Sequence, residues 1–520
     1  MHITSLLYWL PLNDTIDVSG PIDMSRLGST YLPSNSLVNS RGGSAGTFFY
    51  DRTTLYPYAG LVGSDADGIN NALLSFNTTD DTWSLTQVQG GKVSFGNNSE
   101  GVHASDPSTG TSFYTGGWTM AFNGTNNGTV KFQSFNSASP RWTFETATTG
   151  IQGPNILKGA MVYLRKGQSG VLLAFGGYQT AYRGTEFVAW DWDQRSFSDI
   201  FVYDIFSNIW YLQKATGDIP SLRAEFCAGV SAAPDDSSFQ VTIHGGWDQL
   251  GGHAFNDVYV LSIPSFRWIK ISDTHNPDLL GSGSPGRNRL KCDIWNETQL
   301  IVSGGLVTLN TSVGNWETMN EECNKAYPPF KVLDTSTYTW RTSFDPKLQY
   351  SVPYPVTAII GGDSSGNATL TSPSTGWSSE DLGIIFSKTV PRHTYNPVNK
   401  TSNPDSPTST PSSDPGDING SLSQGAIAGI AIAVVMAVIL ILVSTLVWLD
   451  RRHTPIPRKV VETAKTITMS DSRWQKPELE GCHNARHELG ISERRPHEVH
   501  GEGVTRFELP GCSPSLAEMQ

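Results

Sequence analysis

The chain has little charge, and what it has is mostly acidic. Only 16% of its 520 residues are Asp, Glu, Lys or Arg, and the formal net charge is −12. A nucleic-acid partner requires a basic surface that neutralises phosphates, so this composition argues against one. The residues after 449 hold 11 basic and 11 acidic side chains, so the excess acidity lies in the preceding part of the chain.

Motifs for common enzyme chemistry are also absent. The sequence has no GxSxG elbow, no HExxH pair and no phosphate-binding glycine loop. Histidine is scarce before residue 425, and no two histidines stand at a metal-ligand spacing. We therefore expect no catalytic residue, no metal site and no cofactor. His244 and His253 flank a loop, and we expect each to be solvated or hydrogen-bonded within the protein.

Three aspartates are candidates for catalytic carboxylates. Asp204, Asp257 and Asp334 lie beside aromatic residues at repeated positions. Aspartate commonly caps tight turns through hydrogen bonds from its side chain to nearby backbone N–H groups. We expect that structural role at all three positions.

What the sequence does contain is glycine and tryptophan, 51 and 15 residues respectively. Together with the low charge, this composition favours many short strands joined by glycine-rich turns over a helical protein. Double glycines end apolar runs at Gly116–Gly117, Gly176–Gly177, Gly245–Gly246, Gly304–Gly305 and Gly361–Gly362. Alternating segments end in a tryptophan at Trp83, Trp142, Trp210, Trp268 and Trp340.

The spacing of these two marks indicates a repeat. Each tryptophan precedes the next glycine pair by 33, 34, 35 and 36 residues, whereas the step from glycine pair to tryptophan varies from 23 to 36. A unit of four antiparallel strands explains both, because packing fixes one stretch while the loop between its second and third strands accepts insertions. This periodicity predicts a β-propeller with the five tryptophans in the core between sheets.

The order of these residues, a glycine pair followed by an aromatic residue and then a tryptophan, resembles the kelch repeat. The segments FNDVYVLSIPSFRWI and IIGGDSSGNATLTSPSTGW are similar to those of fungal membrane-anchored kelch proteins, whose propellers are grouped with the central domain of galactose oxidase. The related copper radical oxidases use adjacent Tyr and His ligands, and this chain has no Tyr-His pair. The resemblance covers most of residues 5–390.

The count of repeats predicts an all-β, kelch-type β-propeller of six blades with an incomplete N-terminal blade. Five units carry a tryptophan, and residues 5–18 resemble the third and fourth strands of another unit. Only 21 residues separate Trp340 from Gly361, so a last C-terminal strand is expected to complete the blade that the N-terminus begins. No strand ending in a glycine pair precedes residue 5, and the first residues lack a signal-peptide pattern, so we expect that the true start lies upstream.

Residues 425–449 predict a single transmembrane helix. They form 25 consecutive positions without a charged side chain, more than the roughly 20 that cross a bilayer. Arg451, Arg452, Arg458 and Lys459 follow, so the positive-inside tendency places the C-terminus in the cytosol and the N-terminal part outside the plasma membrane.

Glycosylation sequons support this orientation. Asn-x-Ser/Thr occurs ten times before the span and never after it, at Asn13, Asn77, Asn97, Asn123, Asn127, Asn296, Asn310, Asn367, Asn399 and Asn419. We therefore expect a glycoprotein with a propeller at 1–390, a Pro/Ser/Thr-rich stalk at 391–424, the span at 425–449 and a disordered cytosolic tail at 450–520.

Three cysteines fall in the expected ectodomain. Cys292 lies in a strand-like segment and Cys323 in an insertion of the same unit, so we predict a Cys292–Cys323 disulfide, although three thiols permit three pairings. Cys227 is then a small buried hydrophobe. Cys482 and Cys512, in the tail, are expected to stay reduced.

These features predict a cell-surface propeller that binds an unidentified protein or glycan without catalysis. One alternative is a galactose-oxidase-like or carbohydrate-active enzyme with an unrecognised site. Another is a surface sensor whose tail docks a cytosolic partner through its repeated phrases PELEG, HELG and FELPG.

Overall fold

The computed structural model describes most of the chain between residues 6 and 392. The described residues are 6–20, 22–31, 46–58, 72–90, 98–120, 126–144, 151, 153–183, 186–248, 252–271, 286–307 and 330–392. The chain divides into two compact units, Met1–Lys400 and Thr401–Gln520, and every described residue lies in the first.

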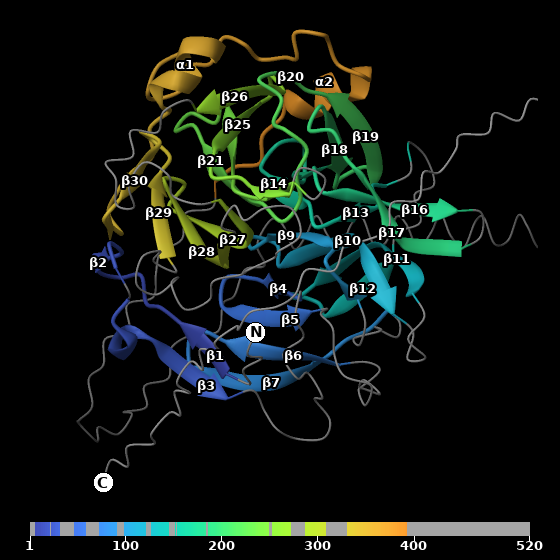
Figure 1. The fold of residues 1–520 in the computed structure, drawn as a ribbon, viewed down its shortest axis with the longest axis vertical. Coiled ribbons are helices and arrows are strands. Elements are labelled where there is room, and N and C mark those ends of the chain that lie inside the picture. Colours follow the sequence, from blue (N-terminus) through green and yellow to red (C-terminus); the bar gives the residue numbers. More distant parts are fainter. Residues whose placement is uncertain are drawn as a thin grey trace, which may run out of the picture. The chain divides into compact units, whose positions relative to one another are not determined.

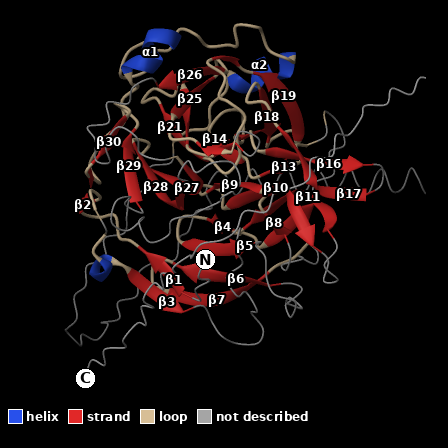
Figure 2. Cartoon of the chain, in the orientation of Figure 1, coloured by secondary structure: helices blue, strands red, loops and turns tan. Residues whose placement is uncertain are grey.

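The described part is built from antiparallel strands, among which five sheets repeat one pattern of four (Figures 1 and 2). Sheet 1 contains β4 (Thr47–Tyr50), β5 (Thr54–Tyr58), β6 (Ala72–Asn77) and β7 (Thr82–Gln87). Sheet 2 contains β9 (Val102–Asp106), β10 (Thr111–Met120), β11 (Asn126–Asn136) and β12 (Arg141–Phe144), with β8 (Asn98–Ser99) added to β10. Sheet 3 contains β14 (Ala160–Leu164), β15 (Val171–Phe175), β18 (Asp199–Asp204) and β19 (Ile209–Lys214).

The last two of these sheets continue the pattern. Sheet 4 contains β21 (Cys227–Ala232), β22 (Phe239–His244), β25 (Val258–Ile263) and β26 (Arg267–Ile271), with β20 (Thr216–Gly217) parallel to β26. Sheet 5 contains β27 (Arg287–Trp295), β28 (Gln299–Val307), β29 (Phe330–Asp334) and β30 (Thr339–Arg341). Smaller pairings join β13 (Ile156–Leu157), β16 (Tyr178–Arg183) and β17 (Glu186–Gln194), and join β23 (Trp247–Asp248) to β24 (His253–Ala254).

The first strands of the five sheets lie next to one another in chain order. β4 contacts β9, β9 contacts β14, β14 contacts β21 and β21 contacts β27. Successive four-stranded sheets that meet through their first strands are the blades of a β-propeller, as the repeat spacing predicts.

Apolar clusters fill the interfaces between consecutive sheets. Phe49, Tyr58 and Phe135 pack between sheets 1 and 2, and similar clusters join sheets 2 to 3, 3 to 4 and 4 to 5. Four of the five repeat tryptophans are buried in these clusters, with exposed fractions of 7% or less, and Trp83 is partly exposed. The tryptophans of the repeat thus contribute apolar area to the contacts between sheets.

The N-terminal strands are arranged differently from the prediction. β1 (Leu6–Trp9) pairs with β3 (Gly28–Tyr31), and β2 (Ile16–Asp17) pairs with β31 (Ser343–Phe344). Residues 5–18 therefore do not supply two neighbouring strands of one sheet. The β2–β31 pairing nevertheless joins the N-terminal strands to the last strand of the described chain, and a small apolar cluster packs there against sheet 5.

The last glycine pair of the predicted repeat ends a helix and not a strand. α1 (Tyr354–Ile360) carries Pro355 in its first turn, where the fixed φ of proline suits a helix and its missing N–H costs no hydrogen bond. Gly361 caps it at φ +75°, in the left-handed region. α2 (Glu380–Phe386) and a 3₁₀ turn, η1 (Met24–Arg26), complete the described helices.

None of the helices among the described residues has the length and apolar character needed to cross a bilayer. The predicted span at 425–449 lies outside the described residues.

Candidate functional site

One end of the sheets carries four charged residues at the same position of the repeat. Glu100, Lys158, Glu225 and Arg289, here named the charged arc, lie at the start of the first strands of sheets 2 to 5. All four have left-handed backbone angles, with φ between 56° and 59°. From Lys158 onward, each backbone N–H donates to the carbonyl of the preceding member, at 2.8 Å, 2.8 Å and 2.9 Å along the arc. The arc therefore links four sheets through the backbone.

The side chains of the arc alternate in sign and pair with their neighbours. Lys158 Nζ lies 2.8 Å from Glu225 Oε1 and 3.4 Å from Glu100 Oε1. Arg289 Nε lies 3.3 Å from Glu225 Oε1, and the Arg289 side chain is 54% exposed. Only Arg289 thus presents much of its charged group to solvent.

The glycine pairs lie at this same end, here called the arc face. A side chain on Gly116 would collide with the backbone of Ile156 in the linker to the next sheet, and one on Gly117 with the backbone of Ser99 in its own sheet. Both glycines have left-handed φ values, 73° and 67°. The pair therefore allows the end of a second strand to abut two sheets at once, which explains why the repeat requires glycine at both positions.

Two buried arginines support the arc face and were missed by the sequence analysis. Arg223 Nη1 donates to Gly245 O at 3.2 Å, and Arg287 Nη1 donates to Gly304 O at 3.4 Å. Both arginines stand two residues before a member of the charged arc, at positions 225 and 289, and this repeated Arg-x-[Glu/Arg] spacing was the available signal.

Asp257 does not cap a turn, so that prediction is wrong. Its carboxylate forms a two-point ion pair with Arg223, with Nη2 3.1 Å from Oδ2. The Arg223 guanidinium is fully buried and also stacks 3.6 Å above the Phe255 ring. A buried guanidinium needs a charged partner, which decides the role of Asp257.

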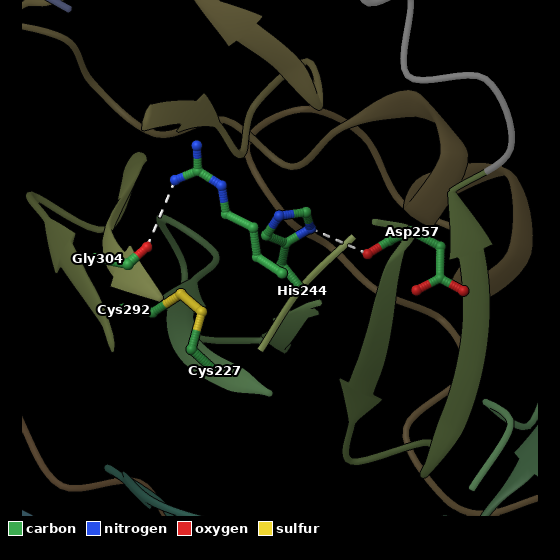
Figure 3. Close-up of a disulfide and its surroundings, with 6 residues drawn as sticks. Cys227, His244, Asp257, Cys292 and Gly304 are labelled. Atoms are coloured by element: carbon green, nitrogen blue, oxygen red, sulfur yellow. Dashed lines mark hydrogen bonds between the residues drawn. A yellow bond between two sulfur atoms is a disulfide. The ribbon is translucent and has the colours of Figure 1, made fainter. Parts of the chain in front are cut away.

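The other two aspartates do cap turns. Asp204 Oδ2 accepts a hydrogen bond from Ser207 N at 3.1 Å, and Asp334 Oδ1 accepts one from Ser336 N at 2.9 Å. His244 is buried and its Nδ1 lies 3.1 Å from the backbone oxygen of Asp257 (Figure 3). Burial, helped by nearby Lys331, lowers the pKa of His244 to about 3, so this ring is neutral and satisfied.

Within the described part of the chain, no three His, Cys, Asp or Glu side chains gather as a metal site. Among the other predicted residues, His253 lies in β24, and its side chain is outside the described set.

The disulfide joins Cys227 to Cys292, so the predicted Cys292–Cys323 pairing is wrong (Figure 3). Cys227 lies in β21 and Cys292 in β27, the contacting first strands of sheets 4 and 5, with Cα atoms 5.3 Å apart. The prediction failed because it paired cysteines within one repeat, whereas packing brings neighbouring repeats together. Cys323, Cys482 and Cys512 lie outside the described residues.

The opposite end of the sheets is crossed by residues 388–392, here named the strap. Val390 N donates to Arg165 O at 2.8 Å, and Arg165 Nη1 donates back to Val390 O at 2.9 Å. Arg392 Nη2 binds Asp236 Oδ1 at 2.7 Å, and Arg392 also pairs with Glu297. Those partners lie in or beside the turns between the first and second strands of sheets 3, 4 and 5. We call this end the strap face.

The charge balance at the strap favours ionised Asp236. Partial burial opposes ionisation of the carboxyl, but hydrogen bonds from Arg165 and Arg392 outweigh burial and lower the Asp236 pKa below its ordinary value. The strap is therefore held most firmly at pH values at which Asp236 is ionised.

Four of the ten sequons have described side chains. Asn13, Asn296 and Asn367 are exposed and Asn77 is partly exposed. The Asn296 amide donates to Leu348 O at 2.8 Å. The side chains of Asn97, Asn123, Asn127, Asn310, Asn399 and Asn419 are outside the described set.

Comparison with known proteins supports the repeat assignment. No family model matches the chain. A curated "Kelch repeat-containing protein" from Arthroderma benhamiae is 32% identical over 241 residues, which cover 41% of this chain. The match spans about a third, 32%, of that protein's own length. It confirms the resemblance to kelch-repeat proteins.

A solved structure titled "Structure of YjhT" matches 56% of this chain and 80% of its own, with 15% identity and a TM-score of 0.36. That similarity is too low to support any argument about function.

Proposed function

We propose that this kelch-repeat chain is a non-catalytic binding module presented at the cell surface by one transmembrane helix. In this proposal the propeller has six blades, the last of which combines β1, β2 and β3 with β31. Residues 425–449 cross the plasma membrane, and the tail from 450 onward lies in the cytosol. The observation that carries the proposal is that the charged arc and the strap lie at opposite ends of the same strands.

The strap defines where the chain leaves the described part. The chain leaves the described part at Arg392, which is fixed to Asp236 and Glu297 on the strap face. Only 32 residues then separate Arg392 from the predicted span. A tether attached at the strap face leaves the arc face free of the stalk, so that a soluble or neighbouring-cell ligand can reach it.

The arc face also receives the connections that vary most between repeats. The second strand of each sheet ends on this face, and the connections from the second to the third strand differ in length more than any other part of the repeat. Variable loops on a rigid sheet scaffold commonly carry recognition. The partly exposed Arg289 offers a fixed positive charge beside them.

The arc chemistry fits binding better than catalysis. The four charged side chains pair with one another along the arc, so their charges are used to join sheets. A general acid–base pair requires groups free to exchange protons with a substrate. We therefore propose a role in recognition, with a carbohydrate or protein as ligand.

A glycan array probed with the full-length chain in detergent tests this proposal. We expect wild type to capture a defined subset of glycans, with capture lost in Arg289→Glu on the arc face. The matched control is Lys388→Glu on the strap face, where the residue contributes its backbone carbonyl to Gly167. Equal loss in both variants would contradict the assigned face, and copper-dependent peroxide release on sugars would favour the oxidase alternative.

A further inference from the structure

The segment that follows sheet 5 fixes α1 beside the strap. Asn367 N donates to Asp235 Oδ2 at 2.6 Å, in the turn between β21 and β22. The next residue of that turn, Asp236, binds the strap. Thr369 N donates back to Ile360 O, the last residue of α1, at 3.0 Å. The helix and the exit of the chain therefore share one attachment point on the strap face.

α1 carries no charged side chain on any side, since its seven residues read YPVTAII. Its inner side is buried in the cluster between sheets 4 and 5 through Val356 and Ile360. Its outward side, here named the apolar face of α1, consists of the exposed residues Tyr354, Pro355, Ala358 and Ile359. Tyr354 is 82% exposed and Ile359 39%. A helix on the surface of a soluble domain normally turns polar side chains to water, so an apolar outward side indicates an apolar partner.

Two more large apolar side chains are exposed at the same end of the sheets. Ile384 of α2, which leads directly into the strap, is 58% exposed. Phe206 is 57% exposed in the turn between β18 and β19. β18 ends at Asp204, opposite Val171 at the start of β15, so this turn also lies at the strap face. The strap face thus carries exposed apolar groups at three separate places.

The size and spacing of these groups favour a lipid surface over a protein. They comprise six residues, whereas a stable protein interface uses about 20–30 residues a side. A bilayer is deformable and meets separate protrusions at once. Apolar side chains enter the boundary between headgroups and acyl chains, and the tyrosine ring, apolar with a polar tip, suits the headgroup level.

The length of the chain beyond Arg392 supplies the second argument. The 32 residues from 393 to 424 lead to the apolar run 425–449. Fully extended, they reach at most about 110 Å. A linker of this length holds two attached partners at an effective concentration on the order of millimolar. A face too small to bind lipid from free solution can therefore bind it once the chain is anchored.

We propose that the apolar face of α1, together with Ile384 of α2, rests on the outer leaflet of the membrane that anchors the chain. The inference rests on the anchor of the proposed function and goes beyond it, because it assigns the lipid surface as a partner of the strap face. The contact limits tilting of the sheets and keeps the arc face outward.

Quenching by nitroxide-labelled lipid tests the proposal on the full-length chain in phosphatidylcholine vesicles. The background carries serine at the three cysteines outside the disulfide: Cys323, Cys482 and Cys512. One fluorophore is then placed through Ile359→Cys, Ile384→Cys or the matched control Leu222→Cys. Leu222 is 39% exposed, like Ile359, but precedes Arg223, which binds Gly245 O on the arc face. We expect shallow nitroxides to quench the probes at positions 359 and 384 but not the probe at 222.

A charge on the apolar face of α1 should weaken the contact. In the chain labelled through Ile384→Cys, Ile359→Asp should lower the ratio of contacting to free molecules about tenfold, because a charged group leaves water reluctantly. Leu222→Asp should leave that ratio unchanged. Quenching should persist in about 1 M salt, which screens charge contacts but not apolar ones. Circular dichroism establishes that each variant is folded.

Flotation of the vesicles separates failure of the contact from failure of the anchor. A chain that floats, with no more quenching at positions 359 and 384 than at 222, overturns the contact and leaves the anchor intact. A chain that does not float refutes both. A fluorescence shift without nitroxide quenching marks a protein on this face and overturns the lipid assignment. Quenching seen only with Asn367→Gln also overturns the proposal, because a glycan at that sequon would then hold the face off the lipid.

Discussion

Replacing Trp268 with alanine should destabilise the propeller much more than the same change at Trp83. Trp268 is fully buried between sheets 3 and 4, where its ring meets Phe175 at 5.9 Å and Phe197 at 5.7 Å. Its Nε1–H donates to Phe197 O at 2.8 Å. The side chain therefore joins two sheets by both apolar contact and a hydrogen bond.

The size of the effect follows from these contacts. Removing a buried tryptophan side chain costs about 3–5 kcal/mol in transfer and cavity free energy. Leaving the Phe197 carbonyl without its donor adds about 1 kcal/mol or more. We expect a loss of about 5 kcal/mol in the free energy of unfolding, a large share of the total stability of a typical domain. Trp268→Phe, which keeps the ring but not the donor, should lose markedly less.

Trp83 is the matched control because it occupies the same position of the repeat in sheet 1. It is partly exposed and its main ring contact is Phe76 at 4.9 Å. Trp83→Ala should therefore cost about 2 kcal/mol or less. Urea unfolding followed by far-ultraviolet circular dichroism measures both variants. Equal losses at the two positions would refute the reasoning, because burial between sheets would then not set the contribution of the tryptophan.

Three further predictions concern the disulfide, a buried histidine and the strap. Changing Cys227 and Cys292 together to alanine should lower the free energy of unfolding by about 4 kcal/mol, because the bridge closes a loop across a sequence separation of 65 residues. Cys323→Ser should change the free energy of unfolding little. Non-reducing peptide mapping checks the pairing, and urea unfolding measures the loss of stability. His244 has a folded pKa of about 3, below the ordinary 6.5, so the unfolded chain binds more protons between those values. Stability should therefore fall as pH drops from 6.5 toward 3, and His244→Gln should flatten that fall in pH-dependent melts. Arg392→Ala should free the strap, which would be measured as faster hydrogen exchange of the strap amides with no change at the charged arc. It should also raise the pKa of Asp236, which NMR titration of that carboxyl would measure.

The repeat could be predicted because its glycine pairs and tryptophans meet simple steric and packing requirements. Glycine is required at 116 and 117 because any side chain would strike neighbouring backbone, and tryptophan supplies the area between sheets. The fifth glycine pair, at 361–362, misled the prediction. A glycine after an apolar run ends a strand or caps a helix equally well, and Pro355 was the residue that distinguished the two.

The arrangement of the site depended on contacts between repeats, which spacing within one repeat cannot show. Cys227 and Cys292 meet because β21 and β27 are neighbouring first strands, although each belongs to a different unit. Asp257 binds Arg223 within the unit of sheet 4, but the two residues are 34 positions apart in sequence, so local turn patterns do not show this pair either. Turn capping at Asp204 and Asp334 is local and was predicted correctly.

Labelling of intact cells with a membrane-impermeant maleimide tests the central claim most directly. The chain carries Cys323→Ser to remove one thiol and Arg289→Cys to place a thiol on the arc face, while Cys482 and Cys512 remain in the tail. We predict that intact cells label the introduced arc cysteine and that the tail cysteines react only after permeabilisation. Labelling of the tail in intact cells, with the arc cysteine protected until permeabilisation, would contradict a binding face presented outside the membrane.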